Sequence, residues 1–200
     1  NITAKRGGNI VMPSFAFERS QEILYYLNRF LLEGRIPHLM VFVDSPMAVD
    51  ITEVFQNHPE SMDPEMNQLL RQRKSPFDFP ELNLVRTIDE SKAIDHTVGS
   101  TIIIAGSGMC TGGRIKYHLV NNISRGESTI VFVGYQAVGT LGRQIIDGAK
   151  EVRILGQYYQ VRAKIVQLNG FSAHADRGEL VRWLSGLRKP PRRVFVTHGE

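Results

Sequence analysis

Two histidines close to the end of the chain have the residue types and spacing for acid–base chemistry or metal binding. His174 stands in Gly-Phe-Ser-Ala-His-Ala-Asp and is followed two residues later by Asp176, while His198 is followed two residues later by Glu200. A carboxylate beside an imidazole can orient the ring for proton transfer or for metal coordination. Taken alone, His174 is better explained as an ordinary loop or helix-cap residue. Its structural setting has to decide between that role and a role in chemistry.

The segments around these histidines predict one strand–helix–strand unit. Residues 161–168 alternate apolar and polar side chains, which indicates a strand. A helix is expected from Asp176, with Ser172 or Asp176 as its cap and an apolar stripe made of Leu180, Trp183, Leu184 and Leu187. Residues 193–197 predict a second strand. A right-handed crossover would place the two strands side by side and parallel, with both histidines on one sheet edge.

The rest of the chain alternates in the same way between predicted strands and predicted helices. Strands are predicted over 9–12, 38–43, 82–87, 101–105 and 129–133, and helices over 17–32, from 47, over 64–73 and 89–95, and through 118 and 146. Residues 57–80 are polar and irregular and indicate a surface excursion. This order predicts an α/β fold with a mostly parallel sheet and helices on both of its faces.

Four turns leave the C-terminal ends of the predicted strands, at 13–14, 44–46, 106–113 and 134–139. Glycines let the backbone approach a ligand closely, and a helix that starts directly afterwards presents free N–H groups to an anion. The candidate substrate-binding residues on this edge are Arg19, Ser45, Ser107, Gly108, Arg114 and Arg143. Three guanidinium groups suit phosphates, although each turn alone is explained equally well as a tight turn with a solvated arginine.

Other ligand motifs are missing from the sequence. The loop 106–113 has neither the Gly-Lys-Ser/Thr ending of a nucleoside-triphosphate loop nor the Gly-x-Gly-x-x-Gly fingerprint of a dinucleotide site. No His-x-His-x-Asp-His cluster occurs, so the chain is not expected to hold a complete zinc site by itself. His118 is expected to pack or hydrogen-bond inside its helix, and the remaining histidines are expected to be structural or exposed.

The composition fits a globular protein and permits a polyanionic partner without requiring one. The chain has 200 residues, of which 42% are hydrophobic and 22% charged, and its formal charge is +4. Cys110 is the one cysteine, which favours a reducing, cytoplasmic location, and no apolar run has membrane-spanning length. Because the sequence begins at Asn1 without methionine and stops directly after a predicted strand, we expect a piece of a longer protein.

Six ordered blocks resemble a known family. They are residues 8–16 with Arg19 and Gln21, then 44–48, 106–109, 134–136, 171–176 and 197–200. In this order they resemble the β-CASP branch of the metallo-β-lactamase superfamily, and most closely the bacterial and archaeal relatives of the endonuclease subunit of the eukaryotic cleavage and polyadenylation factor. The resemblance covers nearly the whole chain.

The resemblance implies a division of the chain and a role for each of the two histidines. Residues 1–156 would form the β-CASP domain, and residues 157–200 would return into the metallo-β-lactamase domain. His174 would contact the scissile phosphate and act as the general acid, and His198 would be a zinc ligand of a kind that points to RNA rather than DNA. The intact protein would hydrolyse single-stranded RNA with two Zn²⁺ ions, but the other metal ligands are missing from this sequence, so the chain alone is not expected to catalyse.

Two further hypotheses stay open at this point. The parent protein could be a catalytically silent RNA-binding subunit of the same fold, or a phosphate-ligand module unrelated to nucleic acid. The preference for endonuclease or exonuclease action and the formation of a homo-oligomer are also open.

Overall fold

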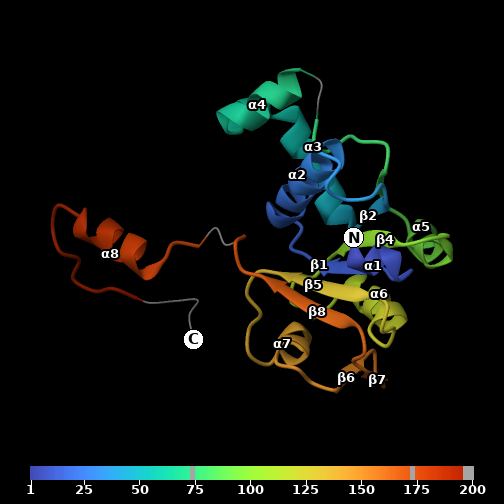
Figure 1. Cartoon of the computed structure of the whole chain (residues 1–200). Coiled ribbons are helices and arrows are strands. Elements are labelled where there is room, and N and C mark those ends of the chain that lie inside the picture. The colour runs from blue at the N-terminus through green and yellow to red at the C-terminus, as the bar shows by residue number, and fades with distance from the viewer. Residues whose placement is uncertain (73–74, 172–173, 196–200) are drawn as a thin grey trace.

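The chain folds around one six-stranded parallel sheet. The computed structural model describes residues 1–72, 75–171 and 174–195 (Figure 1). The strands of this sheet are β1 (Ile10–Pro13), β2 (Met40–Asp44), β3 (Leu82–Leu84), β4 (Thr101–Ala105), β5 (Thr129–Val133) and β8 (Lys164–Leu168). Their order across the sheet is β3-β2-β4-β1-β5-β8, and all the pairings are parallel. The α/β fold with a mostly parallel sheet is therefore confirmed.

Helices follow the strands along the chain. They are α1 (Ile2–Lys5), α2 (Arg19–Leu32), α3 (Pro46–Asn57), α4 (Pro64–Arg71), α5 (Ile88–Ala93), α6 (Ile115–Asn122), α7 (Leu141–Ile146) and α8 (Arg177–Ser185), with 3₁₀ turns at Pro59–Ser61 and Ile94–His96. The predicted helices match these positions to within a few residues. Local signals explain several helix starts, since Ser45, Thr87, Thr140 and Asp176 each accept a backbone N–H at the N-cap.

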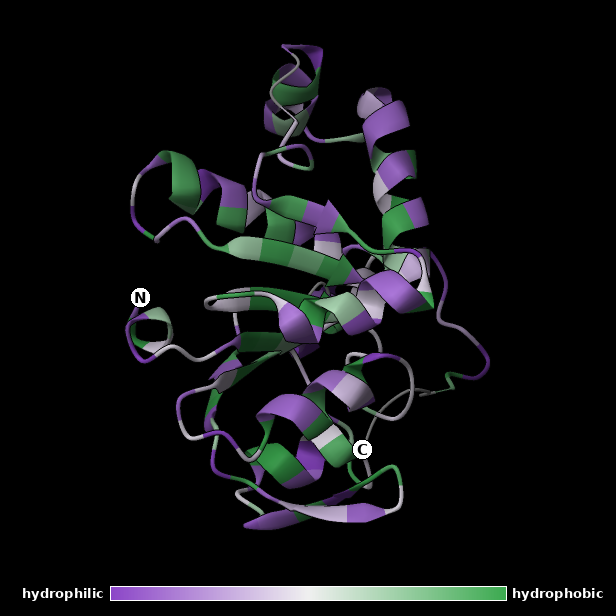
Figure 2. Ribbon diagram, turned by 90° about the vertical axis from the view of Figure 1, so that its right-hand side faces the viewer, coloured by the Kyte–Doolittle hydropathy of each residue, from purple (hydrophilic) through white to green (hydrophobic). Residues whose placement is uncertain are grey.

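Two hydrophobic cores cover the two faces of the sheet. Every residue of β4 and β5 is buried, as expected for strands covered on both sides (Figure 2 shows the central strands mostly in the hydrophobic colour). Alternate strand residues belong to different cores: Ile103 and Phe132 pack with α6 and α7, whereas Ile104 and Val133 pack with α2 and α3. This alternation is the two-residue period of a strand, and it gives both faces a helical cover.

The strand predicted over 161–168 is shorter than expected and has a different neighbour. It begins at Lys164, because the N–H groups of Arg162 and Ala163 both donate to the carbonyl of Ile123 rather than to a strand. Its partner is β5. The strand predicted over 193–197 is wrong where the structure describes it, since residues 193–195 are not in a strand; the rest lies outside the described residues.

A hairpin in residues 151–160 was not predicted. Strands β6 (Glu151–Ile154) and β7 (Gln157–Gln160) pair antiparallel around Leu155 and Gly156, whose φ angles are 49° and 88°. These angles are typical of a type I′ turn, in which leucine is an unusual first residue. The absence of an Asn-Gly or Asp-Gly pair explains why the sequence did not reveal it. The division predicted near 156 falls within this turn.

Helix α8 lies apart from the sheet in Figure 1 and buries none of its own residues. Within the part of the chain that the structure describes, no helix combines the length and the apolar character needed to cross a membrane.

Candidate functional site

The C-terminal ends of the parallel strands bring the predicted turns together on one edge, which we call the rim. Ser14 follows β1, Ser45 follows β2, and the loop 106–113 follows β4, which lies between those two strands. A Cβ atom placed on Gly106 would lie 3.5 Å from Ser45 Oγ and 3.8 Å from the carbonyl oxygen of Ser14. Three segments far apart in sequence therefore meet at the centre of the sheet edge, where open α/β sheets bind ligands.

The loop 106–113 is closely packed and depends on glycine at two positions. Gly113 has a φ of +76°, and a Cβ there would lie 2.4 Å from the carbonyl oxygen of Gly106. At Gly108 a Cβ would lie 2.8 Å from the ring of Phe15. Ser107 Oγ accepts the N–H groups of Thr111 and Gly112 at 3.0 and 3.4 Å. The loop is thus tightly packed and internally hydrogen-bonded.

A buried carboxylate organises the neighbouring part of the rim. Asp44 at the end of β2 has an exposed side-chain fraction of 0%. Its Oδ1 accepts from Arg114 Nη1 at 2.7 Å, and its Oδ2 accepts from Ser91 Oγ at 2.5 Å and lies 2.6 Å from His118 Nε2. Arg114 also donates to the carbonyl of Arg86 at 2.8 Å. We call these four side chains, Asp44, Ser91, Arg114 and His118, the Asp44 cluster.

The cluster keeps Asp44 ionised. Burial acts to raise the pKa of this carboxyl, but the hydrogen bonds from His118, Ser91 and Arg114 outweigh it, so that the pKa is lower than the usual aspartate value. An ionised Asp44 fixes the guanidinium of Arg114 at the start of α6. His118 was expected to pack or hydrogen-bond inside its helix, and it is buried there, but its side-chain partner is Asp44 at the end of β2.

The three predicted arginines all have partners within the protein. Arg19 pairs with Glu22 at 2.6 Å and exposes 12% of its side chain, and Arg114 belongs to the Asp44 cluster. Arg143 Nε donates to both carboxylate oxygens of Asp147 at 2.9 Å. All three lie at or near the start of a helix, since Arg19 begins α2, Arg114 is the N-cap of α6 and Arg143 is the third residue of α7. Each guanidinium therefore already has a structural partner.

The other candidate residues also have local roles. Ser45 Oγ accepts the N–H of Ala48 at 3.4 Å as the cap of α3, Ser107 shapes its own loop, and Gly108 is buried against Phe15. The rim therefore offers a ligand backbone and aromatic surface as well as charged side chains.

Two exposed aromatic side chains on the rim were not among the predicted site residues. Phe15 after β1 and Tyr135 after β5 expose 46% and 54% of their surface, and these strands are neighbours. Gln136 is buried and its amide donates to the carbonyls of Gly108 and Tyr135 at 3.0 and 3.1 Å, which ties the two turns together. Both residues stand in turns that follow a predicted strand, and that position was the signal in the sequence.

The histidine pair is described only in part. His174 is exposed in the segment before α8, and His198 lies outside the described residues. Asp176 Oδ1 accepts the N–H of Glu179 at 2.8 Å, while Glu179 accepts the N–H of Asp176 at 2.9 Å. Asp176 is thus confirmed as the cap of α8. Its predicted pairing with His174 and the meeting of the two histidines stay predictions.

The described residues do not form a metal site by themselves. Among residues 1–72, 75–171 and 174–195, no three His, Cys, Asp or Glu side chains come together in a way that could hold a metal ion. Burial raises the pKa of the Cys110 thiol to about 12, so this side chain is neither a nucleophile nor a thiolate ligand at neutral pH. The zinc chemistry that the resemblance implies therefore has no complete ligand set here.

Comparisons with known proteins find relatives along nearly the whole chain. Residues 158–200 match the model described as a Zn-dependent metallo-hydrolase RNA specificity domain. The chain is 40% identical over 198 residues to Ribonuclease TTHA0252 of Thermus thermophilus, 32% over 204 residues to transcription termination factor FttA of Methanosarcina mazei, and 31% over 198 residues to an RNase J-like protein of Methanocaldococcus jannaschii. These alignments cover 99% of the chain but 44%, 32% and 44% of the relatives, so the chain spans less than half their length.

The central sheet and its helices correspond to a family model. Residues 20–145, which run from α2 through α7, match the model of the Beta-Casp domain. The resemblance noted in the ordered blocks is confirmed, and the chain belongs to the β-CASP family.

Proposed function

We propose that this chain is the RNA-binding portion of a zinc-dependent ribonuclease, with single-stranded RNA lying along the rim. The observation that supports this most directly is the meeting of the turns after β1, β2, β4 and β5 on one sheet edge in a member of the β-CASP family. The ribonuclease relative and the RNA specificity model of residues 158–200 support the same substrate.

Two kinds of contact would hold the strand. The guanidinium of Arg114, which Asp44 holds in place and which keeps 21% of its side chain exposed, would meet phosphate oxygens at the start of α6. Phe15 and Tyr135 offer exposed rings on which bases can stack without sequence preference. This arrangement grips a single strand and reads little of its sequence.

His174 would supply the proton for the leaving oxygen, and His198 would bind zinc together with ligands from elsewhere in the intact protein. We also propose that the intact protein binds two zinc ions. The β-CASP domain would extend over residues 1–156, and residues 157–200 would belong to the metallo-β-lactamase domain. The family-model matches, which end at 145 and resume at 158, support the division.

Cleavage by the full-length protein tests the role of His174. His174→Ala should lower the rate of RNA cleavage by about 10²- to 10⁴-fold, which is typical of a lost general acid. His58→Ala, a change at an exposed histidine paired with Glu60, serves as the matched control. Circular dichroism should show that both variants stay folded. Undiminished cleavage by His174→Ala would remove the proposed role.

RNA binding separates the ribonuclease from the two alternatives. A catalytically silent subunit would bind single-stranded RNA but would not cleave it even as the wild-type full-length protein. A phosphate-ligand module would show no salt-dependent binding of an RNA oligonucleotide. We expect both salt-dependent binding and cleavage.

A further inference from the structure

A cavity on the side of α2 has a chemistry that does not suit RNA. It has a volume of about 450 Å³ and lies between α2, α4 and the segment after β8. Its charged lining consists of four carboxylates, Glu18, Glu22, Asp63 and Glu65, and one guanidinium, Arg29. This excess of negative charge would repel phosphates, so the cavity cannot be an extension of the RNA path on the rim.

Aromatic rings form the apolar part of the same wall. The lining rings are Tyr25, Tyr26, Phe55, Phe77 and Phe171. Tyr26 meets both Tyr25 and Phe171 edge to face, with ring centroids 5.3 and 5.7 Å apart. The ring of Phe171 already holds a cation, because Arg19 Cζ lies 5.6 Å from its centroid. Rings with carboxylates beside them are the surroundings in which organic cations bind.

A buried amide in the cavity wall has an acceptor without a donor. Gln21 is 2% exposed, and its Nε2 donates to the carbonyls of Ala16 and Ala48 and to Thr52 Oγ1 at 3.1, 3.3 and 2.9 Å. These bonds fix the orientation of the amide. Its Oε1 has no hydrogen-bond partner among the described residues, and a buried acceptor left unpaired costs about 1–3 kcal/mol. Gln21 thus gives the cavity wall a polar group of fixed orientation.

The described carboxylates of the cavity do not converge on one point, which favours an extended cation over a metal ion. Glu22 is bonded to Arg19, and Glu65 accepts from Tyr25 at 2.6 Å across the gap between α2 and α4. Within the described residues no three acidic or histidine side chains converge as a metal would require. Separate carboxylates match a ligand whose positive charges are spread along a chain. We infer that this cavity binds an organic polycation of the polyamine class, with its ammonium groups on the carboxylates and its methylenes on the rings.

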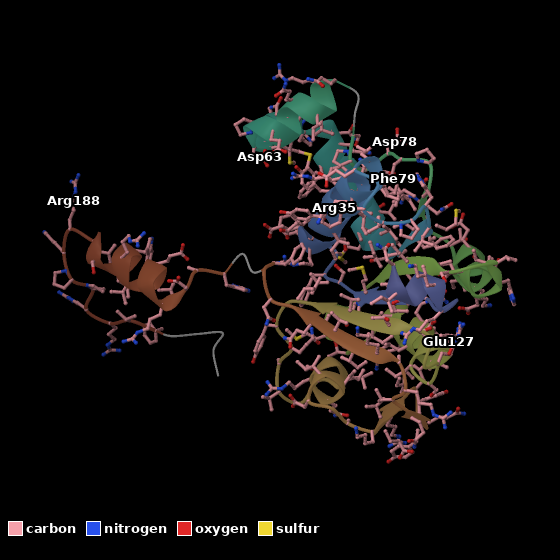
Figure 3. The ribbon with its side chains drawn as sticks, in the orientation of Figure 1. Arg35, Asp63, Asp78, Phe79, Glu127 and Arg188 are labelled. Atoms are coloured by element: carbon pink, nitrogen blue, oxygen red, sulfur yellow. The ribbon has the colours of Figure 1, made fainter. Side chains whose placement is uncertain are left out.

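Titration of the nucleic-acid-free, full-length protein with spermidine at low salt tests this inference. We expect saturable binding in a one-to-one ratio, measured by calorimetry. Glu18→Gln and Glu65→Gln should each weaken it up to about fivefold, as for a partly exposed ion pair, and Tyr26→Leu by about threefold. Glu127→Gln is the matched control, since Glu127 pairs with Arg125 far from Asp63 of the cavity (Figure 3), and its binding should equal that of the wild type.

Three results would overturn the inference. The first is the absence of saturable spermidine binding, and the second is an equal loss of spermidine affinity in the cavity variants and in Glu127→Gln. The third is much tighter binding of a peptide that contains lysine and arginine, which would make the cavity a docking groove for a protein. RNA cleavage is measured on the same samples. The cavity variants leave the rim unchanged. Loss of spermidine binding together with normal RNA cleavage would therefore bear on the cavity and not on the proposed ribonuclease function.

Discussion

The sheet region and helix α8 obey the same local rules but differ in packing. Both contain a capping box, Thr87 with Glu90 at the start of α5 and Asp176 with Glu179 at the start of α8. The sheet buries whole strands, whereas Trp183 of α8 is 68% exposed. The comparison shows that caps and apolar periodicity are sufficient to define a helix, while the stability of the fold comes from what the apolar face touches.

The largest contrast between the regions should appear when one large side chain is removed from each. Phe132 in β5 has an exposed fraction of 0%, so Phe132→Ala should lower the free energy of unfolding by about 3–5 kcal/mol. Trp183→Ala should change it by less than about 0.5 kcal/mol, as for an exposed position. Urea unfolding followed by far-ultraviolet circular dichroism measures both. A large loss with Trp183→Ala would show that α8 packs on the sheet.

Removal of the charge of Asp44 should have the next largest effect. Asp44→Asn leaves Arg114 and His118 without their buried anion, and we expect a loss of about 2–3 kcal/mol in the free energy of unfolding. Asp50→Asn is the control, because Asp50 pairs with Arg86 on the exposed surface and should cost less than about 1 kcal/mol. Similar losses in the two variants would contradict the central role of the Asp44 cluster.

The same carboxyl should make stability depend on acid pH. Because the folded-state pKa of Asp44 is lower than its unfolded value of about 3.9, its contribution is complete above that value. It should decrease as the pH falls through the folded-state pKa. Urea midpoints measured between about pH 5 and pH 2 should therefore fall more steeply for the wild type than for Asp44→Asn. Parallel curves would mean that Asp44 is not ionised in the folded protein.

The two capping boxes give a matched pair of smaller effects. Thr87→Ala should lower the free energy of unfolding of the sheet by about 1 kcal/mol. Asp176→Ala should reduce the helicity of α8 but leave the urea midpoint of the sheet unchanged, since α8 buries none of its residues. A shift of the sheet midpoint by Asp176→Ala would erase the distinction between the two regions.

The smallest effect is expected in the hairpin turn. Leu155 has a φ of 49°, which is costly for a side chain with a Cβ, so Leu155→Gly should raise the free energy of unfolding by about 0.5–1 kcal/mol. Leu168→Gly is the contrasting change, because Leu168 lies in β8 and has no such conformation to relieve. Destabilisation by Leu155→Gly would mean that the leucine side chain contributes more than its backbone strain costs.

Much of this fold could be predicted because its signals are local. The β-branched run Thr101–Ala105 predicted β4 with its observed bounds, and the glycines of the loop 106–113 marked the turn that lies at the centre of the rim. Alternation of strands and helices was sufficient for the parallel sheet. The order of the blocks along the chain was sufficient for the family.

The partners of individual side chains depended on tertiary structure. Asp44 and His118 are 74 positions apart and Asp44 and Arg114 are 70 apart, so neither contact leaves a local pattern. The pairing of β8 with β5 and the unpaired acceptor of Gln21 likewise arise only when distant segments pack. Local sequence determined most of the helices and strands of the sheet region and which turns lie on the rim. Only the packing of those elements decided that the predicted arginines are held by carboxylates, because burial and long-range hydrogen bonds exist only in the folded chain.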